Sequence, residues 1–280
     1  MTRLDGVTAC VTGGARGIGR ATALALATRG ARVWIGDIDA NAAEATAAEV
    51  GGHAAPLDVT DPASFAAFLE SAAASGPVEI LVNNAGIMRL APFLELDIAG
   101  HHRELAINVG GVVNGMSLAL PGMVARGRGH IVNVASMAAK VTTPGAAVYC
   151  ASKFAVAALS RAVRAELDGT GVSVTTVMPA AVHTELTSGV NLALQPTLQP
   201  AEVGEAIADT VRHRRAEVTI PRWLAPMGTV EQGVPESALR LVKRRFVGRD
   251  PGQYDAGRRR AYLDRIGAEP ERRAATHPDG

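Results

Sequence analysis

The sequence predicts an α/β fold, in which a doubly wound parallel sheet of about seven strands carries helices on both faces and a helical extension follows at the C-terminal end. Short apolar runs alternate along the chain with segments of helical period, a pattern typical of parallel strands joined by right-handed crossovers. A glycine-rich turn follows the first apolar run directly, where the first strand of such sheets enters a helix. The length of 280 residues and the hydrophobic content of 48% suffice for one core between two helical layers.

Each apolar run is assigned to one strand. The seven expected strands span residues 7–12, 32–37, 53–58, 80–83, 130–136, 172–178 and 218–220. The stretch 105–125 has no charge, but it contains Asn108, Asn114, Pro121 and four glycines, so we expect a helix buried against the sheet rather than a membrane span. Residues 186–200 follow neither the strand nor the helix period, and no regular element is expected there.

Composition excludes several classes of protein and site. Cys10 and Cys150 stand alone in apolar surroundings, so buried thiols are expected rather than a disulfide framework. His101 and His102 are expected to be solvated near a helix start, and no histidine spacing suggests a metal site. A basic start followed by an apolar signal segment is lacking, which favours a cytoplasmic protein. No nucleic-acid-binding module is recognised.

The glycine-rich turn has the chemistry of a dinucleotide site. It reads Gly13-Gly14-Ala15-Arg16-Gly17-Ile18-Gly19, and an alanine-rich helical segment follows it. Glycines let the backbone approach a pyrophosphate, whose charge is offset by free N–H groups and the helix dipole. Asp37 ends the second apolar run, at the distance expected for a carboxylate that binds the adenosine ribose. We therefore expect this turn to bind a nucleotide.

A second pattern predicts alcohol–ketone chemistry. Tyr149 and Lys153 are four residues apart, so on a helix they share a face. The ammonium would favour the phenolate and lower the tyrosine pKa from about 10, which gives a proton donor and acceptor. Such a pair alone is usually an ordinary helix face. Lysine is scarce, however, occurring only as Lys140, Lys153 and Lys243, and the glycine-rich turn lies upstream.

These residues, with Asp58, the motif Asn83-Asn84-Ala85-Gly86, Asn108 and Ser136, resemble the short-chain dehydrogenase/reductase family over about residues 5–221. The resemblance implies a Rossmann fold at 1–223 as the catalytic domain, with 224–280 as a basic extension rather than an independent domain. It implies a catalytic set of Asn108, Ser136, Tyr149 and Lys153. It implies cofactor contacts from Gly13, Arg16, Gly17, Ile18, Gly19, Asp37, Asp58, Val59, Asn84, Ala85, Gly86, Tyr149, Lys153, Pro179, Val182 and Thr184.

In that set, Tyr149 would exchange the proton, Ser136 would hydrogen-bond the carbonyl oxygen, Lys153 would also contact the nicotinamide ribose, and Asn108 would anchor a water. Ala180 stands where the family usually has glycine. Asp37 would repel the 2′-phosphate of NADP, so NAD is favoured. Arg16 is a residue type that suits NADP at this position. Because no basic partner follows the second strand, Arg16 is interpreted as solvated or beside the pyrophosphate.

The substrate is expected to be a lipophilic secondary alcohol or ketone. Apolar residues surround the expected site: Met88, Met137, Ala138, Ala139, Val141, Leu186 and Leu192. Sugars and acyl-carrier substrates are less favoured, and His183 could approach the cofactor. Because a fold does not fix a function, the alternative is a non-catalytic dinucleotide-binding sensor or scaffold.

The C-terminal extension concentrates positive charge. From Leu239 to Gly280 there are eleven Lys or Arg and six Asp or Glu, which gives a net charge of +5 against +1 for the whole chain. A helix is expected at 237–248. The tail could pack on its own or a partner subunit, end in disorder near 269–280, or touch an anionic membrane, in that order of preference. The family resemblance implies a homodimer or homotetramer.

Overall fold

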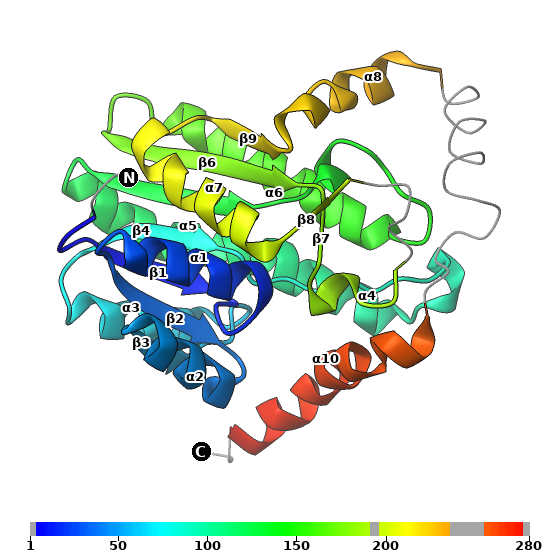
Figure 1. Ribbon diagram of the computed structural model, residues 1–280, viewed down its shortest axis with the longest axis horizontal. Coiled ribbons are helices and arrows are strands. Elements are labelled where there is room, and N and C mark those ends of the chain that lie inside the picture. Colours follow the sequence, from blue (N-terminus) through cyan, green and yellow to red (C-terminus); the bar gives the residue numbers. More distant parts are fainter. Residues whose placement is uncertain (1–3, 191–195, 236–254, 277–280) are drawn as a thin grey trace.

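The computed structural model describes residues 4–190, 196–235 and 255–276, and its centre is a seven-stranded parallel sheet (Figure 1). The strand order is β3-β2-β1-β4-β5-β6-β9, so the chain winds outward in both directions from β1. The strands are β1 Thr8–Thr12, β2 Arg32–Asp37, β3 His53–Pro56, β4 Val78–Asn83, β5 Gly129–Val134, β6 Val172–Pro179 and β9 Glu217–Ile220. The predicted fold class is confirmed. β3 ends two residues early, because Asp58 already belongs to the turn that leads into the next helix.

Helices cover both faces of the sheet. α1 Gly17–Thr28, α2 Ala40–Val50 and α7 Pro200–His213 pack on one face; α3 Pro62–Ala73, α5 Gly111–Ala125 and α6 Ala147–Glu166 pack on the other. Aspartates start three helices: Asp39, Asp61 and Asp97 accept a backbone N–H from the first turn of α2, α3 and α4 Ile98–Leu105. Gly204 of α7 lies against the backbone of α1, where a Cβ would come within 2.6 Å of the carbonyl of Ala21.

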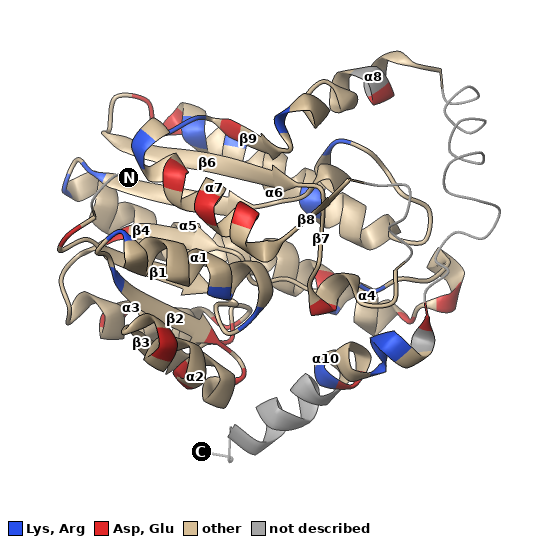
Figure 2. Ribbon diagram, in the orientation of Figure 1, with Lys and Arg blue, Asp and Glu red and all other residues tan. Residues whose placement is uncertain are grey.

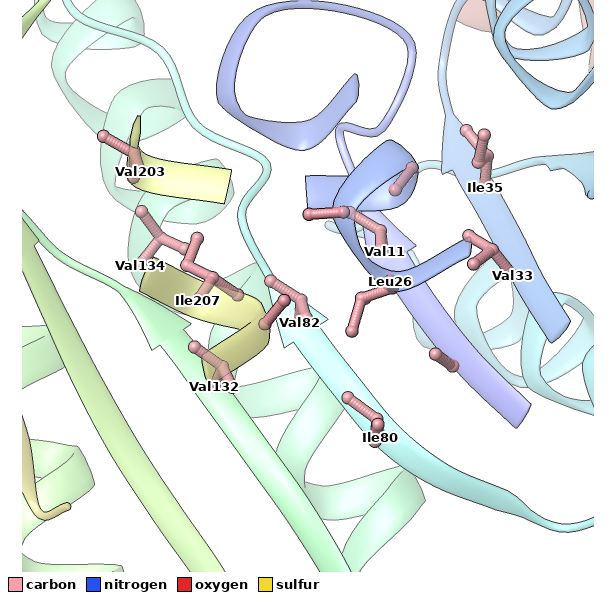
Figure 3. Packing of buried hydrophobic residues seen from close by; sticks show 14 of the residues in the cluster. Val11, Leu26, Val33, Ile35, Ile80, Val82, Val132, Val134, Val203 and Ile207 are labelled. Atoms are coloured by element: carbon pink, nitrogen blue, oxygen red, sulfur yellow. The ribbon is translucent and has the colours of Figure 1, made fainter. Parts of the chain in front are cut away.

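Aliphatic side chains fill the space between the sheet and its helices. Figure 3 shows Val11, Val82 and Val134 from three strands pointing toward Leu26 of α1 and Ile207 of α7. Burying one such side chain contributes on the order of 2 kcal/mol. The second face has its own core, formed mainly by Phe65, Phe68, Leu81, Met116, Met123, Ile131 and Val156. Because the strands are parallel, their carboxyl ends lie at a common edge of the sheet, and the two cores pack the sheet on both faces.

The long helix through α4 and α5 differs from its prediction. It runs Ile98–Ala125 with a π-helical turn at Ala106–Gly110, and by length and composition it is apolar enough to cross a membrane. α5 packs on β4 and β5, yet only 39% of the apolar window is buried. Leu118 and Val124 remain 38% and 39% exposed. The helix therefore lies against the sheet as expected, but one apolar face points away from it.

Two further features were not expected. β7 Ala181–Val182 pairs in parallel with β8 Thr197–Leu198, which returns the irregular segment to the sheet edge. The tail forms α8 Met227–Gly233 and α10 Ala256–Thr276, so it is helical into the part expected to be disordered. α10 lies below α4 in Figure 1 and packs on its own chain through Arg103 and Ile266. The predicted helix at 237–248 and Leu192 lie outside the described residues.

Candidate active site

A cleft of about 2280 Å³ opens at the carboxyl edge of the sheet. Its walls come from the β1–α1 turn, the ends of β4 and β5, the start of α6, the segment after β6, and α10. Ligands of doubly wound sheets bind at this edge, beside the first strand, where the strand order reverses. The cleft exceeds the volume that a drug-sized ligand needs, so a dinucleotide and a substrate fit together.

The glycine-rich turn lies too close to its neighbours for side chains. Gly13 has φ +61°, and a Cβ there would lie 2.8 Å from the Cα of Ala85. A Cβ on Gly19 would lie 2.1 Å from the carbonyl oxygen of Gly13. No side chain caps the start of α1, so its first N–H groups face the cleft without a side-chain acceptor. These features fit a pyrophosphate.

Asn84 and Ala85 support the turn from the end of β4. Thr12 Oγ1 accepts the backbone N–H of Asn84 at 3.0 Å and that of Ala85 at 3.1 Å. The Asn84 amide donates to the carbonyls of Thr12 and Gly13, both at 3.0 Å. The Asn84 side chain therefore braces the glycine turn, and its backbone lines the cleft.

Asp37 and Arg16 line the cleft beside the ends of β2 and β1. The Asp37 carboxylate accepts the N–H groups of Ala15 and Asp39 at 3.1 Å each. Burial raises the Asp37 pKa, and these two hydrogen bonds oppose the rise. Arg16 Nη2 donates to Asp39 at 2.7 Å. Arg16 therefore pairs with Asp39, the acid that follows the second strand. The sequence did not predict this pair.

The remaining predicted cofactor residues also line the cleft, with the exception of Gly19. Asp58 accepts from Thr60, while Thr184 lies over Gly17, with its Cγ2 3.2 Å from the place of a Cβ there. Ala180 keeps an ordinary backbone and donates to the carbonyl of Ile220 at 2.7 Å, so alanine fits where glycine is usual. The cleft is also lined by Gly13, Gly17, Ile18, Val59, Gly86, Pro179 and Val182.

Three of the four predicted catalytic side chains meet beyond the end of β5. Tyr149 and Ser136 both line the cleft, Ser136 lowers the pKa of the Tyr149 phenol, and the Ser136 oxygen accepts the N–H of Ala138 at 3.1 Å. Lys153 Nζ lies 5.6 Å from the centroid of the Tyr149 ring and donates to the carbonyl of Val134 at 3.0 Å. The helical spacing therefore places the phenol and the ammonium on one face, as predicted.

Asn108 completes the set from the π-helical turn. Its amide accepts from the N–H of Ile87 and donates to the carbonyl of Ile87, both at 2.9 Å, and also donates to Ser152 Oγ at 3.0 Å. A Cβ on Gly86 would lie 3.1 Å from the Asn108 oxygen and 3.6 Å from Lys153 Nζ. Glycine at 86 thus leaves the room in which these two groups lie side by side.

Burial changes the acidity of the two key groups. It raises the pKa of Tyr149, although the Ser136 hydrogen bond lowers it. It lowers the pKa of Lys153 to about 8, against the charge of Glu104, which raises it. The sequence predicted that Lys153 would hold the Tyr149 pKa below 10, whereas in the structure burial raises that pKa. The reason is that desolvation of the phenolate outweighs the favourable interactions around it.

Three residues of the site were not foreseen. Arg259 of α10 is fully buried and donates to the carbonyls of Met88, Leu186 and Ser188, at 2.7, 2.8 and 3.1 Å. Tyr262 accepts the N–H of Met88 at 2.8 Å, and Glu104 is fully buried on α4. In the sequence, Arg259 sits inside a run of three arginines that resembles a solvated basic tail. The spacing of Arg259, Tyr262 and Ile266 was the available signal of a buried helix face.

The substrate end of the cleft is mostly apolar. Of the predicted residues, Met88, Met137, Ala138, Val141 and Leu186 line it, whereas Ala139 does not. The tail adds apolar side chains from Trp223, Leu224, Met227, Tyr262 and Ile266.

The histidine prediction was half wrong. His101 is buried and stacks on Phe93 with the ring centroids 4.7 Å apart, while His102 is exposed. His183 is exposed at the cleft wall. Among the described residues, no group of three His, Cys, Asp or Glu could hold a metal, and Cys10 and Cys150 are buried thiols.

Known proteins share this sequence and architecture. The family model for short chain dehydrogenases matches residues 7–195. D-threitol dehydrogenase of Mycolicibacterium smegmatis is 45% identical over 190 residues, which cover 66% of this chain and 73% of that protein. The 2,5-dichloro-2,5-cyclohexadiene-1,4-diol dehydrogenase LinX of Sphingobium indicum is 39% identical over 194 residues, covering 67% and 78%. The crystal structure of gox2181 superposes with a TM-score of 0.73 at 28% identity, covering 78% of this chain and 94% of that one.

Proposed function

This chain belongs to the short chain dehydrogenase family, an assignment that makes it an oxidoreductase acting on alcohols, and we propose that it interconverts a lipophilic secondary alcohol and its ketone with NAD. The observation that carries the proposal is the placement of Tyr149 and Ser136 in one cleft, with Lys153 Nζ 5.6 Å from the centroid of the Tyr149 ring. A phenol beside a second hydroxyl can exchange a proton with the oxygen of a bound alcohol.

Each side chain then has one task. When bound, NAD supplies the carbon that accepts the hydride. Tyr149 takes the hydroxyl proton during oxidation and returns it during reduction, and Ser136 donates a hydrogen bond to the same oxygen. Lys153, whose pKa is lowered by burial to about 8, is still mostly charged at neutral pH and stabilises the phenolate. Asn108, locked by Ile87, keeps its carbonyl oxygen beside Lys153.

The proposed preference for NAD rests on charge. The Asp37 carboxylate borders the cleft at the end of β2, where it can accept hydrogen bonds from a ribose but would repel a 2′-phosphate. Arg16 is engaged by Asp39 at 2.7 Å, so the cation that would suit NADP already has an acidic partner. NADP is the weaker alternative.

The proposed substrate class rests on the apolar lining of the cleft beyond Tyr149. Met88, Leu186 and Tyr262 face this end from three separate segments. The named relatives are dehydrogenases of a polyol and of a chlorinated ring diol, which supports a secondary alcohol as the substrate. Whether this chain prefers a hydrophobic alcohol to a polyol is therefore the point to test. Apolar walls favour the more hydrophobic molecule.

The test is a substrate panel. Reduced-cofactor formation would be followed with hydrophobic secondary alcohols, cyclic diols and polyols, with NAD and NADP in parallel. We expect the highest kcat/KM for a hydrophobic alcohol with NAD. A preference for polyols would overturn the lipophilic class. NAD binding without turnover on any alcohol would favour a sensor or scaffold instead.

We also propose a homodimer, formed through the exposed apolar face of α5 and α6. A shallow groove there is lined by Val113, Leu120, Pro121, Val124, Leu159 and Val163. The occupant we propose is a second copy of this chain, because a two-fold axis would set the same apolar stripe against itself and remove it from water. Assembly beyond a dimer and a cytoplasmic location stay predictions.

A further inference from the structure

Glu104 is a buried acid that the proposed reaction does not use. Its exposed fraction is 0%. One carboxylate oxygen accepts the backbone N–H of Arg89 at 3.3 Å, and the other has no hydrogen-bond partner among the residues that the structure describes. A carboxylate removed from water requires compensation by nearby charge or hydrogen bonds, because its desolvation costs several kcal/mol. The surroundings of Glu104 should therefore contain cations.

The fold places Glu104 behind the catalytic set. It lies one helical turn before Asn108, and α4 packs on α6, the helix that carries Lys153. Lys153 is itself 5% exposed and lies beside the Asn108 oxygen at Gly86. The acid and the lysine thus lie on two helices that pack together.

Three cations act on the Glu104 carboxylate. Arg89 comes from the segment after β4, Lys153 from α6, and Arg259 from α10. Burial raises the pKa of Glu104 to about 7, while the Arg89 N–H and these three cations lower it. The same coupling acts on Lys153, whose pKa is lowered by burial to about 8 and raised by Glu104. Tyr149 feels Glu104 only weakly.

We propose that Glu104 is a positioning residue, whose buried carboxylate keeps Lys153 charged and in place beneath Tyr149. Arg259 in turn favours the ionised form of that carboxylate, so the C-terminal helix contributes to the electrostatics of the site without touching the reacting atoms. The catalytic consequence rests on the proposed role of Lys153, but the charge coupling exists whether or not the protein turns over an alcohol.

The direction of the effect follows from the charges. A carboxylate beside an ammonium stabilises the charged form of the lysine, so removing the carboxylate lowers the lysine pKa. In Glu104→Gln the lysine would then lose its proton near neutral pH, and the phenolate would lose its supporting charge.

The chain is well suited to a direct measurement, because it has only three lysines. Selective 15N labelling of the lysine side chains gives three signals to titrate, and Lys153→Arg identifies the buried one. We expect the Lys153 pKa to fall by about one unit in Glu104→Gln. It should stay near the wild-type value in Glu104→Asp, which keeps the charge, and in Glu95→Gln, which removes an exposed glutamate nearby.

Kinetics give a second readout. The alkaline limb of the kcat–pH profile should move to lower pH by the same amount in Glu104→Gln, with the KM for the alcohol nearly unchanged. An unmoved Lys153 titration in a folded Glu104→Gln protein would overturn the proposal. If that variant does not fold, the wild-type titration decides: a Lys153 signal that shows no inflection near pH 7, where Glu104 titrates, overturns it. A coupled titration without turnover would instead leave the coupling intact and refute the proposed function.

Discussion

At the scale of single residues, the site depends on groups whose ordinary properties are changed by burial. Tyr149 is harder to ionise than a free phenol, and Lys153 loses its proton more easily than a free amine. These shifts have one cause, the removal of charge from water, and they oppose the pairing that the helix spacing sets up. The proposed chemistry therefore needs both Ser136, which lowers the Tyr149 pKa, and the charge held on Lys153.

The first prediction concerns the proton donor. Tyr149→Phe removes the hydroxyl and little else, so cofactor affinity should change by only a few fold. Turnover should fall by about three orders of magnitude, the range of general acid–base contributions. Single-turnover kinetics and titration of cofactor fluorescence separate the two effects. Turnover close to that of the wild type would refute the role of Tyr149.

The second prediction concerns Asp37. Asp37→Ala removes the carboxylate that would repel a 2′-phosphate, so the kcat/KM ratio of NADP to NAD should rise about tenfold. Glu44→Ala removes one exposed acid from the neighbouring helix α2 and should leave the ratio unchanged. A wild type that already prefers NADP would contradict the charge argument.

At the scale of elements, α10 contacts two segments that are far apart in the chain. Figure 2 shows basic residues along its described part, and one of them, Arg259, is fully buried. Arg259 joins the carbonyls of Met88 and Leu186, and stacks on Tyr262 with the guanidinium carbon 4.7 Å from the ring centroid. Arg265 pairs with Glu185. The helix thus fixes the two segments that wall the substrate end.

The third prediction follows from this contact. Arg259→Met removes one donor from each of three backbone carbonyls, which should destabilise the fold by about 2 kcal/mol or more and release the two segments. The KM for the alcohol should rise several fold, more than kcat falls. Arg260→Met is the matched control, because Arg260 is exposed on the same helix. Thermal melting and steady-state kinetics of both variants test the difference, and equal behaviour of the two would contradict it.

At the scale of the whole molecule, no residue that the structure describes covers the exposed apolar face of the long helix. Val113 is 41% exposed and stands with Leu120 and Val124 along the groove between α5 and α6. α6 also carries Tyr149 and Lys153, so pairing at this face would stiffen the helix that positions the catalytic groups.

The fourth prediction tests that face. Val113→Glu places a charge in the proposed interface, and desolvating it should shift the protein from dimer to monomer at micromolar concentration. Leu94→Glu adds the same charge at a leucine that is almost fully exposed elsewhere, so it should not alter assembly. Size-exclusion chromatography with light scattering measures the outcome. A dimer that survives Val113→Glu places the interface on another face.

The sequence by itself determined the local features of this protein. Alternating periods predicted the seven strands within about two residues, because both faces of each strand are buried and the strand therefore reads as a continuous apolar run. The glycine turn and the pair Tyr149 and Lys153 could be recognised because their chemistry depends on short spacings, which the chain carries directly.

Tertiary structure alone decided what depends on distant contacts. Glu104 and Arg259 stand 155 residues apart in the chain, and the sequence around Glu104 does not distinguish it from a surface charge. The parallel pairing of Ala181–Val182 with Thr197–Leu198 likewise uses backbone groups, which leave no pattern in side chains. The tyrosine pKa belongs to the same class, since its balance is set by how much water the folded cleft removes. Spacing fixes which groups share a helix face, whereas burial, which requires the whole chain, decides how those groups behave.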